Sequence, residues 1–285
     1  MKRQTLYIAL FAAFTALTGC GGGSALEPGP LNDEGITRGS TDPHSLLGNP
    51  DNALVDANNH SKYFSKKTQY HLSYNDNQRI ANWVSWHLDN RDLGSVSRTD
   101  AFAPDTSLPA SFVKLTTNDY TGTGHDRGHQ CPSGDRTDSV ANNQSTFLMT
   151  NMSPQQHGLN SGPWELLETE TRNQISAGKE CYVISGPGFN STTHTTVGSK
   201  KIHVPSWCWK IVLILPKASG DDLTRITTGT RVIAVKMPNT ASTYGHQWRE
   251  YRVSPATIEV ATGLKFFTAL PAATADILRT KIDKN

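Results

Sequence analysis

Short apolar segments bounded by asparagine, glycine or proline recur along the chain after His44. Their lengths and boundaries are typical of β-strands. The pattern predicts six strand segments: Gln69–Tyr74, Ala81–Leu88, Ser145–Met152, Glu180–Ser185, Lys201–Leu215 with an interruption at Pro205, and Arg231–Met237.

One segment between these strands has the period of a helix. Side chains suited to burial recur every three to four residues, at Trp164, Leu167, Thr171 and Ile175. Proline suits a first helical turn and glycine the residue after the last, so we expect a helix that opens near Asn160–Pro163 and closes at Gly178. Two shorter helices are expected from Ser254 to Gly263 and from Pro271 to about Ile282. Strands and helices without regular alternation predict an α+β domain with a central, largely antiparallel sheet flanked by helices.

The N-terminus has a different pattern. Lys2 and Arg3 precede an apolar run, Leu6–Leu17, that is too short to span a bilayer of about 30 Å and is typical of a signal peptide. Small residues just before Cys20 resemble the bacterial lipobox, which implies cleavage after residue 19 and acylation of Cys20. The alternative is an ordinary secretory signal with a chance cysteine, and both interpretations export the protein.

We therefore divide the chain into a lipoprotein signal peptide (1–19), a flexible linker with a lipidated Cys20 (20–43) and one folded domain (44–285). The linker is rich in Gly, Ser and Pro and has no apolar periodicity. Gly21 stands where an aspartate is associated with inner-membrane retention, so analogy with lipoprotein sorting favours an outer-membrane or periplasm-facing protein of the cell envelope.

Composition and charge narrow the function classes. The 285 residues include 36% hydrophobic and 18% charged residues, which excludes a disordered polyelectrolyte and a multi-span membrane protein. Removal of residues 1–19 takes away two basic residues and leaves 25 of each sign. A neutral protein lacks the global attraction of a strongly basic nucleic-acid binder, so contact with a polyanion requires a local basic cluster.

Three cysteines remain after Cys20 is assigned to lipid. An odd number in an oxidising compartment allows at most one intramolecular disulfide. Cys181 and Cys208 each lie in a strand-like segment and are expected to form it, whereas Cys131 lies in a loop. Three buried thiols are the alternative.

The densest polar cluster spans Gly122–Arg136. Within it, His129 lies in a breaker-rich loop, where an accessible imidazole with a pKa near 6.5 could accept a proton at pH 7. Arg127 supplies a planar donor fork suited to phosphate oxygens. The alternatives are a structural loop histidine and a zinc cluster with His125 and Cys131, which lacks a fourth ligand.

A second polar cluster lies on the predicted helix. Glu168 and Arg172 are four residues apart on one face, and Asn160 lies about 80° round from Glu168 if the helix begins there. An amide oxygen and a carboxylate in these positions can bind one hard divalent cation. The amide oxygen would coordinate it directly, and the carboxylate would hold water molecules of its hydration shell. Alternatively, Asn160 caps the helix, and Glu168 and Arg172 form a solvated pair.

Several ordered motifs in these clusters resemble the DNA/RNA non-specific endonucleases of the ββα-metal superfamily, most closely the cyanobacterial-type secreted branch. The motifs are Asp126–His129, Asn151–Gln155 and Leu159–Gly162, with Ala81–Val84, Ser206–Trp207 before Lys210, and Arg231–Val235 around them. The resemblance runs from about His44 to the C-terminus. It implies the ββα-metal nuclease fold.

The resemblance also implies roles for individual residues. It makes His129 the general base, Asn160 the direct ligand of a Mg²⁺ or Mn²⁺ ion, and Glu168 a holder of metal-bound waters. It places Arg98, Arg127 and Arg172 near the scissile phosphate and makes Asn151 a residue that positions the site. Cys131 stands where a small residue such as alanine is expected.

The implied activity is hydrolysis of DNA and RNA to 5′-phosphate and 3′-hydroxyl ends with little regard for sugar or sequence. A proteinaceous inhibitor is a further partner that the resemblance allows, and the oligomeric state stays open. The alternative function is an envelope lipoprotein that binds polyanions or a partner protein on a nuclease-like scaffold without cutting.

Overall fold

The computed structural model describes residues 42–190, 192 and 194–285. The predicted signal peptide, Cys20 and the linker up to residue 41 lie outside the described residues. The described fold begins with Asp42, which caps the short 3₁₀ helix η1 (Pro43–Ser45) through its side chain. Within the described residues, we find no helix with the length and apolar composition that crossing a membrane requires.

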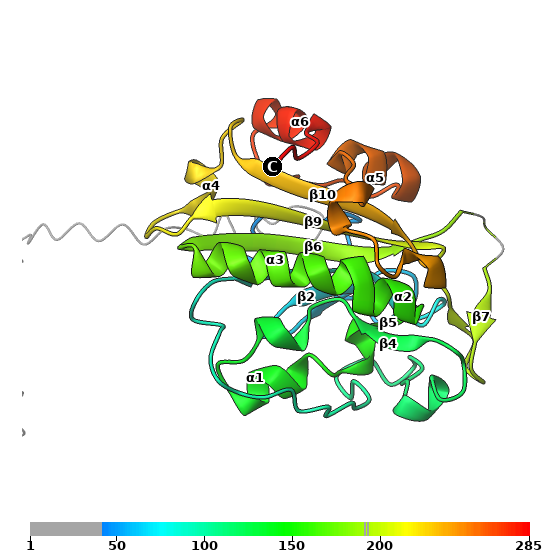
Figure 1. Cartoon of the computed structure of the whole chain (residues 1–285). Helices are drawn as coiled ribbons and strands as arrows, with labels where there is room; N and C mark the ends of the chain where they lie inside the picture. Colours follow the sequence, from blue (N-terminus) through cyan, green and yellow to red (C-terminus); the bar gives the residue numbers. More distant parts are fainter. Residues whose placement is uncertain (1–41, 191, 193) are drawn as a thin grey trace, which may run out of the picture.

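A six-stranded sheet forms the centre of the domain (Figure 1). Its order is β1-β2-β3-β6-β9-β10, and every neighbouring pair is antiparallel. The strands are β1 (Tyr63–Lys66), β2 (His71–Asn75), β3 (Ile80–Leu88), β6 (Lys179–Gly188), β9 (Trp207–Pro216) and β10 (Arg231–Pro238). The predicted α+β class with a largely antiparallel sheet is confirmed.

Both faces of this sheet are buried. Along β9, Cys208, Val212 and Ile214 belong to one core cluster. Trp209, Ile211 and Leu213, which alternate with these positions, belong to a second cluster that also contains residues of α5 (Pro255–Thr262) and α6 (Ala272–Thr280). A strand buried on both faces has a nearly continuous apolar sequence, which explains why the central strands were recognisable.

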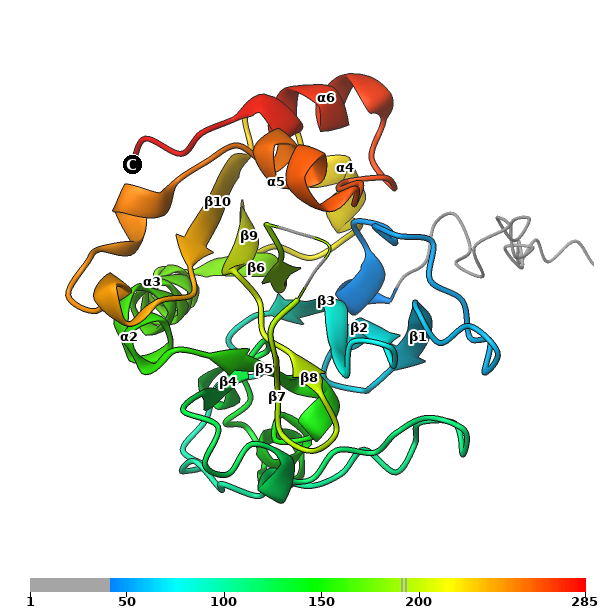
Figure 2. The same cartoon turned by 90° about the vertical axis from the view of Figure 1, so that its right-hand side faces the viewer.

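A smaller layer covers the first face (Figure 2). It contains a two-stranded antiparallel ribbon of β4 (Asp126–His129) and β5 (Met152–Gln155), followed by α2 (His157–Leu159) and the long helix α3 (Glu165–Ser176). This ribbon followed by a helix is the ββα unit that the resemblance implied. Figure 1 shows α5 and α6 on the opposite side of the sheet from α3.

Shorter elements complete the fold. They are η2 (Thr117–Asp119), η3 (Ser133–Asp135), α1 (Val140–Ser145), η4 (Met149–Asn151), η5 (Asn160–Trp164), β7 (Thr196–Val197), β8 (Ile202–His203), α4 (Asp222–Arg225), η6 (Ala241–Thr243) and η7 (Trp248–Tyr251). The two C-terminal helices were predicted correctly, and Ser254 and Gly263 flank α5 as its N-cap and left-handed C-cap.

The predicted strand Ser145–Met152 is wrong. Ser145 ends α1, a 3₁₀ turn occupies Met149–Asn151, and β5 begins only at Met152. The Asn151 side chain bonds the backbone of Cys131 and Thr146, so this segment is held by side-chain hydrogen bonds where a strand ladder was expected.

The predicted helix from Asn160 begins differently. Asn160–Trp164 forms a π-helical turn in which Gly162 has non-helical φ and ψ of −115° and −123°, and regular helix begins at Glu165. The end is as predicted, since Gly178 follows the helix with a φ of +75°.

The expected disulfide between Cys181 and Cys208 is wrong. β6 and β9 pair so that Cys181 lies opposite Ile214, whereas Cys208 lies opposite Pro187. The six steps along the strand from residue 181 to residue 187 span about 20 Å, far beyond the roughly 7 Å that a disulfide allows between Cα atoms. Cys181, Cys208 and Cys131 are all free, buried thiols.

Candidate active site

One cavity of about 370 Å³ collects six of the predicted site residues. It is lined by Arg98, Arg127, His129, Asn160, Glu168 and Arg172, together with residues of η3 and the start of α3. These side chains come from the segment after β3, from β4, from the π-helical turn and from α3. Residues spread over 75 positions of the chain therefore line the same cavity.

His129 is held in the strand layer and is not the accessible loop residue that its sequence neighbours predicted. It ends β4 opposite Met152, and only 8% of its surface is exposed. Phe147 and Phe102 pack against the ring at centroid distances of 4.8 and 5.8 Å. The indole N–H of Trp164 donates to the His129 carbonyl at 3.2 Å.

Burial also decides the protonation state of His129. Desolvation, with Arg98 and Arg127 nearby, lowers the pKa of the imidazole to about 3, so the ring is neutral at pH 7. Its Nε2 is enclosed without a hydrogen-bond partner. Nδ1 is therefore the ring nitrogen that can exchange a proton with the cavity.

Asn160 is oriented by a carboxylate from β4. Its Nδ2 donates to Asp126 Oδ2 at 2.9 Å, and Nδ1 of His157 contacts the same oxygen at 2.9 Å. With the amide nitrogen directed to Asp126, the amide oxygen of Asn160 is left for another ligand. Asn160 follows the last residue of α2 and does not cap the N-terminus of α3, which begins at Glu165.

Glu168 and Arg172 do not pair with one another. Oε1 of Glu168 accepts from Nζ of Lys210 at 3.1 Å, and burial raises the pKa of the Glu168 carboxyl while Lys210 opposes this change. Arg172 donates to Asp135 at 3.1 Å. Asp135 is 1% exposed and also accepts from the indole N–H of Trp86 at 2.9 Å.

The other two arginines lie on aromatic rings. Cζ of Arg98 is 4.8 Å from the centroid of Phe147, and Cζ of Arg127 is 4.3 Å from that of Phe102. Arg98 also donates to Ser133 at 3.3 Å and pairs with Asp100 at 2.6 Å. A guanidinium stacked on its face keeps in-plane N–H groups for phosphate oxygens.

Asn151 does not line the cavity and acts on the backbone beside it. Its side chain is fully buried, accepts from the N–H of Cys131 at 3.0 Å and donates to the Cys131 carbonyl at 2.8 Å. A third bond, to the Thr146 carbonyl, measures 2.7 Å. Asn151 thereby fixes the segment that follows His129.

Comparison with known proteins agrees with this geometry. The profile of the family described as DNA/RNA non-specific endonuclease matches residues 51–273. The chain belongs to this family. It is 42% identical over 240 residues to a nuclease of Nostoc sp. (strain PCC 7120), with 84% of this chain and 86% of the relative covered.

Two further matches extend the comparison. The mitochondrial Nuclease EXOG of Xenopus laevis is 31% identical over 210 residues, which span 70% of this chain and 56% of that longer protein. A crystal structure of the EndoG/EndoGI complex superposes with a TM-score of 0.67 at 23% identity, covering 80% of this chain and 91% of that one, and it shows the shared fold. The protein is a nuclease of a metal-dependent, phosphodiester-hydrolysing family.

The donor atoms at the cavity fit a hard divalent cation. The amide oxygen of Asn160 and the carboxylate of Glu168 are both oxygen donors, which Mg²⁺ and Mn²⁺ prefer. Since Lys210 occupies only one carboxylate oxygen of Glu168, the other is available for water around such an ion.

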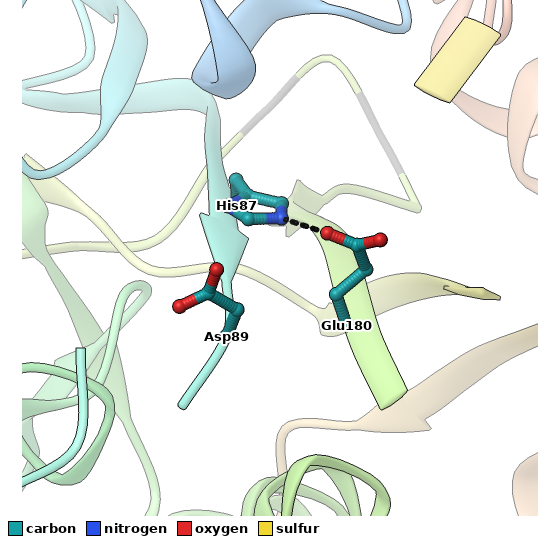
Figure 3. A group of neighbouring side chains, drawn as sticks. All are labelled: His87, Asp89 and Glu180. Atoms are coloured by element: carbon teal, nitrogen blue, oxygen red, sulfur yellow. Dashed lines mark hydrogen bonds and ion pairs between the residues drawn. The ribbon is translucent and has the colours of Figure 1, made fainter. Parts of the chain in front are cut away.

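A different group of buried side chains has ligand atoms within 4.8 Å of one another, namely His87, Asp89 and Glu180 (Figure 3). It lies on the face of the sheet away from α3, because His87 packs against Tyr182 of the second core cluster. Its two carboxylates contact three cationic side chains, Arg91, Lys217 and Arg225. The negative charges are thus compensated without an ion, so this group is an ion-pair network apart from the cavity.

The zinc alternative has no support in the described part of the chain. His125 contacts Gln156 and the Thr123 carbonyl, and Cys131 is fully buried, so the two do not join His129 as ligands.

Three residues that the sequence analysis left without a role contact the predicted ones. Asp126 orients Asn160, Asp135 pairs with Arg172, and Lys210 pairs with Glu168. The sequence could have indicated a role for Lys210, because it is the single charged residue in the apolar strand β9.

Proposed function

We propose that this nuclease is an exported, Mg²⁺- or Mn²⁺-dependent endonuclease that hydrolyses DNA and RNA to 5′-phosphate and 3′-hydroxyl ends. One observation carries the proposal: His129 and Asn160 line the same cavity with three arginines. A single phosphate in that cavity can contact a proton acceptor on one side and oxygen donors for a cation on the other.

His129 is the general base. Its neutral ring accepts a proton from water through Nδ1, and the hydroxide forms a bond to phosphorus in line with the 3′ oxygen. The bond from phosphorus to the 3′ oxygen breaks, and this oxygen takes a proton from solvent water to become the 3′-hydroxyl. Arg98, Arg127 and Arg172 donate to the phosphate oxygens as negative charge grows on them. A cation held by Asn160 and by the water around Glu168 would supply further charge stabilisation at the phosphate.

The same residues explain weak discrimination between substrates. The cavity offers cationic and proton-accepting groups suited to the phosphodiester, which DNA and RNA share. Recognition of backbone phosphate carries no direct sequence information. The alternative function, a polyanion binder that does not cleave, is less well supported, because an enclosed neutral histidine among three arginines adds no positive charge for binding.

Digestion of plasmid and of RNA by purified residues 21–285 tests the activity. We expect cleavage with Mg²⁺ or Mn²⁺, loss of cleavage with EDTA, and a loss of about 10²- to 10⁴-fold for His129→Ala with the fold intact. End-labelling of the products should find 5′-phosphates. Intact plasmid across several divalent ions would refute the catalytic proposal, and DNA retention without cleavage would favour the binding alternative.

Export and anchoring form a separate part of the proposal. The signal-like residues 1–19 and the lipobox-like sequence before Cys20 support a lipoprotein of the cell envelope, with residues 44–285 as the exported domain. Expression of the full chain in bacteria fed radiolabelled palmitate should label the protein, and Cys20→Ser should abolish the label. Labelling that persists in Cys20→Ser would contradict the anchor.

A protein inhibitor is a further proposed partner. The structure that superposes on this chain is described as an EndoG/EndoGI complex that explains EndoG inhibition. A nuclease whose cavity presents three arginines is suited to an acidic inhibitor. Pull-down with an inhibitor of a related nuclease, scored by loss of plasmid cleavage, tests this point.

A further inference from the structure

Lys210 is a charged residue inside the most apolar strand of the sheet. It lies in the middle of β9, opposite Ser185 of β6 and Val235 of β10. Its side chain is 1% exposed and faces the core beneath α3, as Cys208 and Val212 do. Lysine is almost never fully buried unless it is paired, so this position requires an explanation.

The contacts of Lys210 converge on one carboxylate. Nζ lies 3.1 Å from Oε1 of Glu168, which is its single ion pair among the described residues. The ammonium also lies 4.0 Å from the ring centroid of Trp164 and 5.9 Å from that of Trp86. Aromatic faces stabilise a desolvated cation, and here they hold it at a fixed place beneath α3.

Stability alone does not explain a buried ion pair at this position. Replacement of a buried ion pair by apolar side chains of similar size is often neutral or stabilising, because two charges no longer have to be desolvated. A methionine would fill nearly the same volume between the two tryptophans. The lysine is therefore better explained by its effect on Glu168, whose carboxylate lines the cavity.

We propose that Lys210 is a positioning residue of the nuclease, which holds one oxygen of Glu168 so that the other faces the cation site. The inference rests on the role proposed above for Glu168. Trp164 strengthens the connection, since it packs on the ammonium and also donates to the His129 carbonyl. Trp164 thus connects the Lys210–Glu168 pair to the backbone of His129.

Lys236 provides a matched control. It lies on the neighbouring strand β10, and its Nζ is 4.3 Å from the ring centroid of Trp207. It is only half-buried and forms no ion pair within the described residues, nor does it line the cavity. Lys236→Met therefore removes a lysine from a tryptophan face without touching Glu168.

A double-mutant cycle on activity tests the proposal. The variants are Lys210→Met, Glu168→Gln, the combination of both, and Lys236→Met, each assayed for plasmid cleavage over a range of Mn²⁺ concentrations. Loss of a residue that orients a metal-site group typically costs about 10- to 100-fold in metal affinity or activity. We expect Lys210→Met to show a loss of this size together with a raised Mn²⁺ concentration for half-maximal rate, and Lys236→Met to stay within about twofold of the parent.

In the Glu168→Gln background, Lys210→Met should cause no further loss, because its effect passes through the carboxylate. The inference is overturned if Lys210→Met keeps the parental rate and Mn²⁺ dependence, or if it costs as much with Glu168→Gln as without it. Circular dichroism and thermal unfolding report on the fold, and Lys210→Gln replaces Lys210→Met should the latter be unfolded. Failure of the parental protein to cleave would instead overturn the proposed function itself.

Discussion

Replacement of Gly128 by alanine tests how closely β5 packs behind His129, the proposed general base. Gly128 precedes His129 on β4 and lies opposite Ser153. A Cβ at this position would lie 2.1 Å from Oε1, 2.4 Å from Cδ and 2.6 Å from Cγ of Gln155. All three distances are shorter than real Cβ contacts, so the Gln155 side chain or the β4 backbone must move.

The size of the effect follows from the surroundings of Gln155. Its side chain is fully buried, and Nε2 contacts Sγ of Cys208 at 3.5 Å, so it has no open space to enter. Overpacking of a buried site costs about 1–3 kcal/mol. A displacement of about 1 Å at a catalytic group can lower the rate about 10²-fold, and His129 is the adjacent residue. We expect Gly128→Ala to lose stability and activity in these ranges.

Urea unfolding and plasmid cleavage measure the two losses. The matched variant is Gly128→Ala combined with Gln155→Ala, which removes all three clashing atoms and should recover most of the cleavage rate relative to Gly128→Ala alone. A Gly128→Ala protein with parental stability and rate would refute the steric argument. So would a double variant that is no more active than Gly128→Ala.

Three further predictions concern charges and thiols. Burial lowers the pKa of both His44 and His71 from 6.5 to about 4, so the unfolded chain binds more protons and the free energy of unfolding should fall as the pH drops from about 6.5 toward 4. His44→Gln should flatten this dependence in urea titrations, and an unchanged slope would contradict the assignment. Asp135→Asn removes the charge that pairs with Arg172 and should lower the rate of plasmid cleavage about tenfold. The control Thr169→Ala removes only a hydroxyl partner of Arg172 and should lower the rate less than about twofold. Equal losses of rate in the two variants would contradict a role of the Asp135 charge. Because all three described cysteines are free thiols, dithiothreitol should leave the melting temperature unchanged, and a lowered one would indicate a disulfide.

Local pattern identified most of the central sheet because strands buried on both faces have continuous apolar sequences. Helix α5 was equally visible, since its N-cap and its glycine C-cap are adjacent to it in the chain. Strand β4 was missed for the opposite reason. Its four residues, Asp126–His129, are polar or glycine, and pairing with β5 makes them a strand.

Six of the seven residues predicted for the active site line one cavity, but the side chains that they bond there were not predicted. The ordered motifs and the family resemblance that they carry were enough to name six of the residues that line the cavity. Glu168 and Arg172 are neighbours on a helix and were weighed as a pair, yet each bonds a residue some 40 positions away. A helix period indicates which side chains share a face, but it contains no information about what packs against that face.

The sequence alone therefore determined the fold class, the ordered nuclease motifs and the identity of six of the residues that line the cavity. Only the tertiary structure decided that two phenylalanines pack against His129. It also decided that Lys210 pairs with Glu168 and Asp135 with Arg172, and that the three cysteines remain free thiols. The physical reason is that burial, ion pairing and strand register depend on groups distant in the chain, whereas secondary-structure pattern and motif order depend on neighbours.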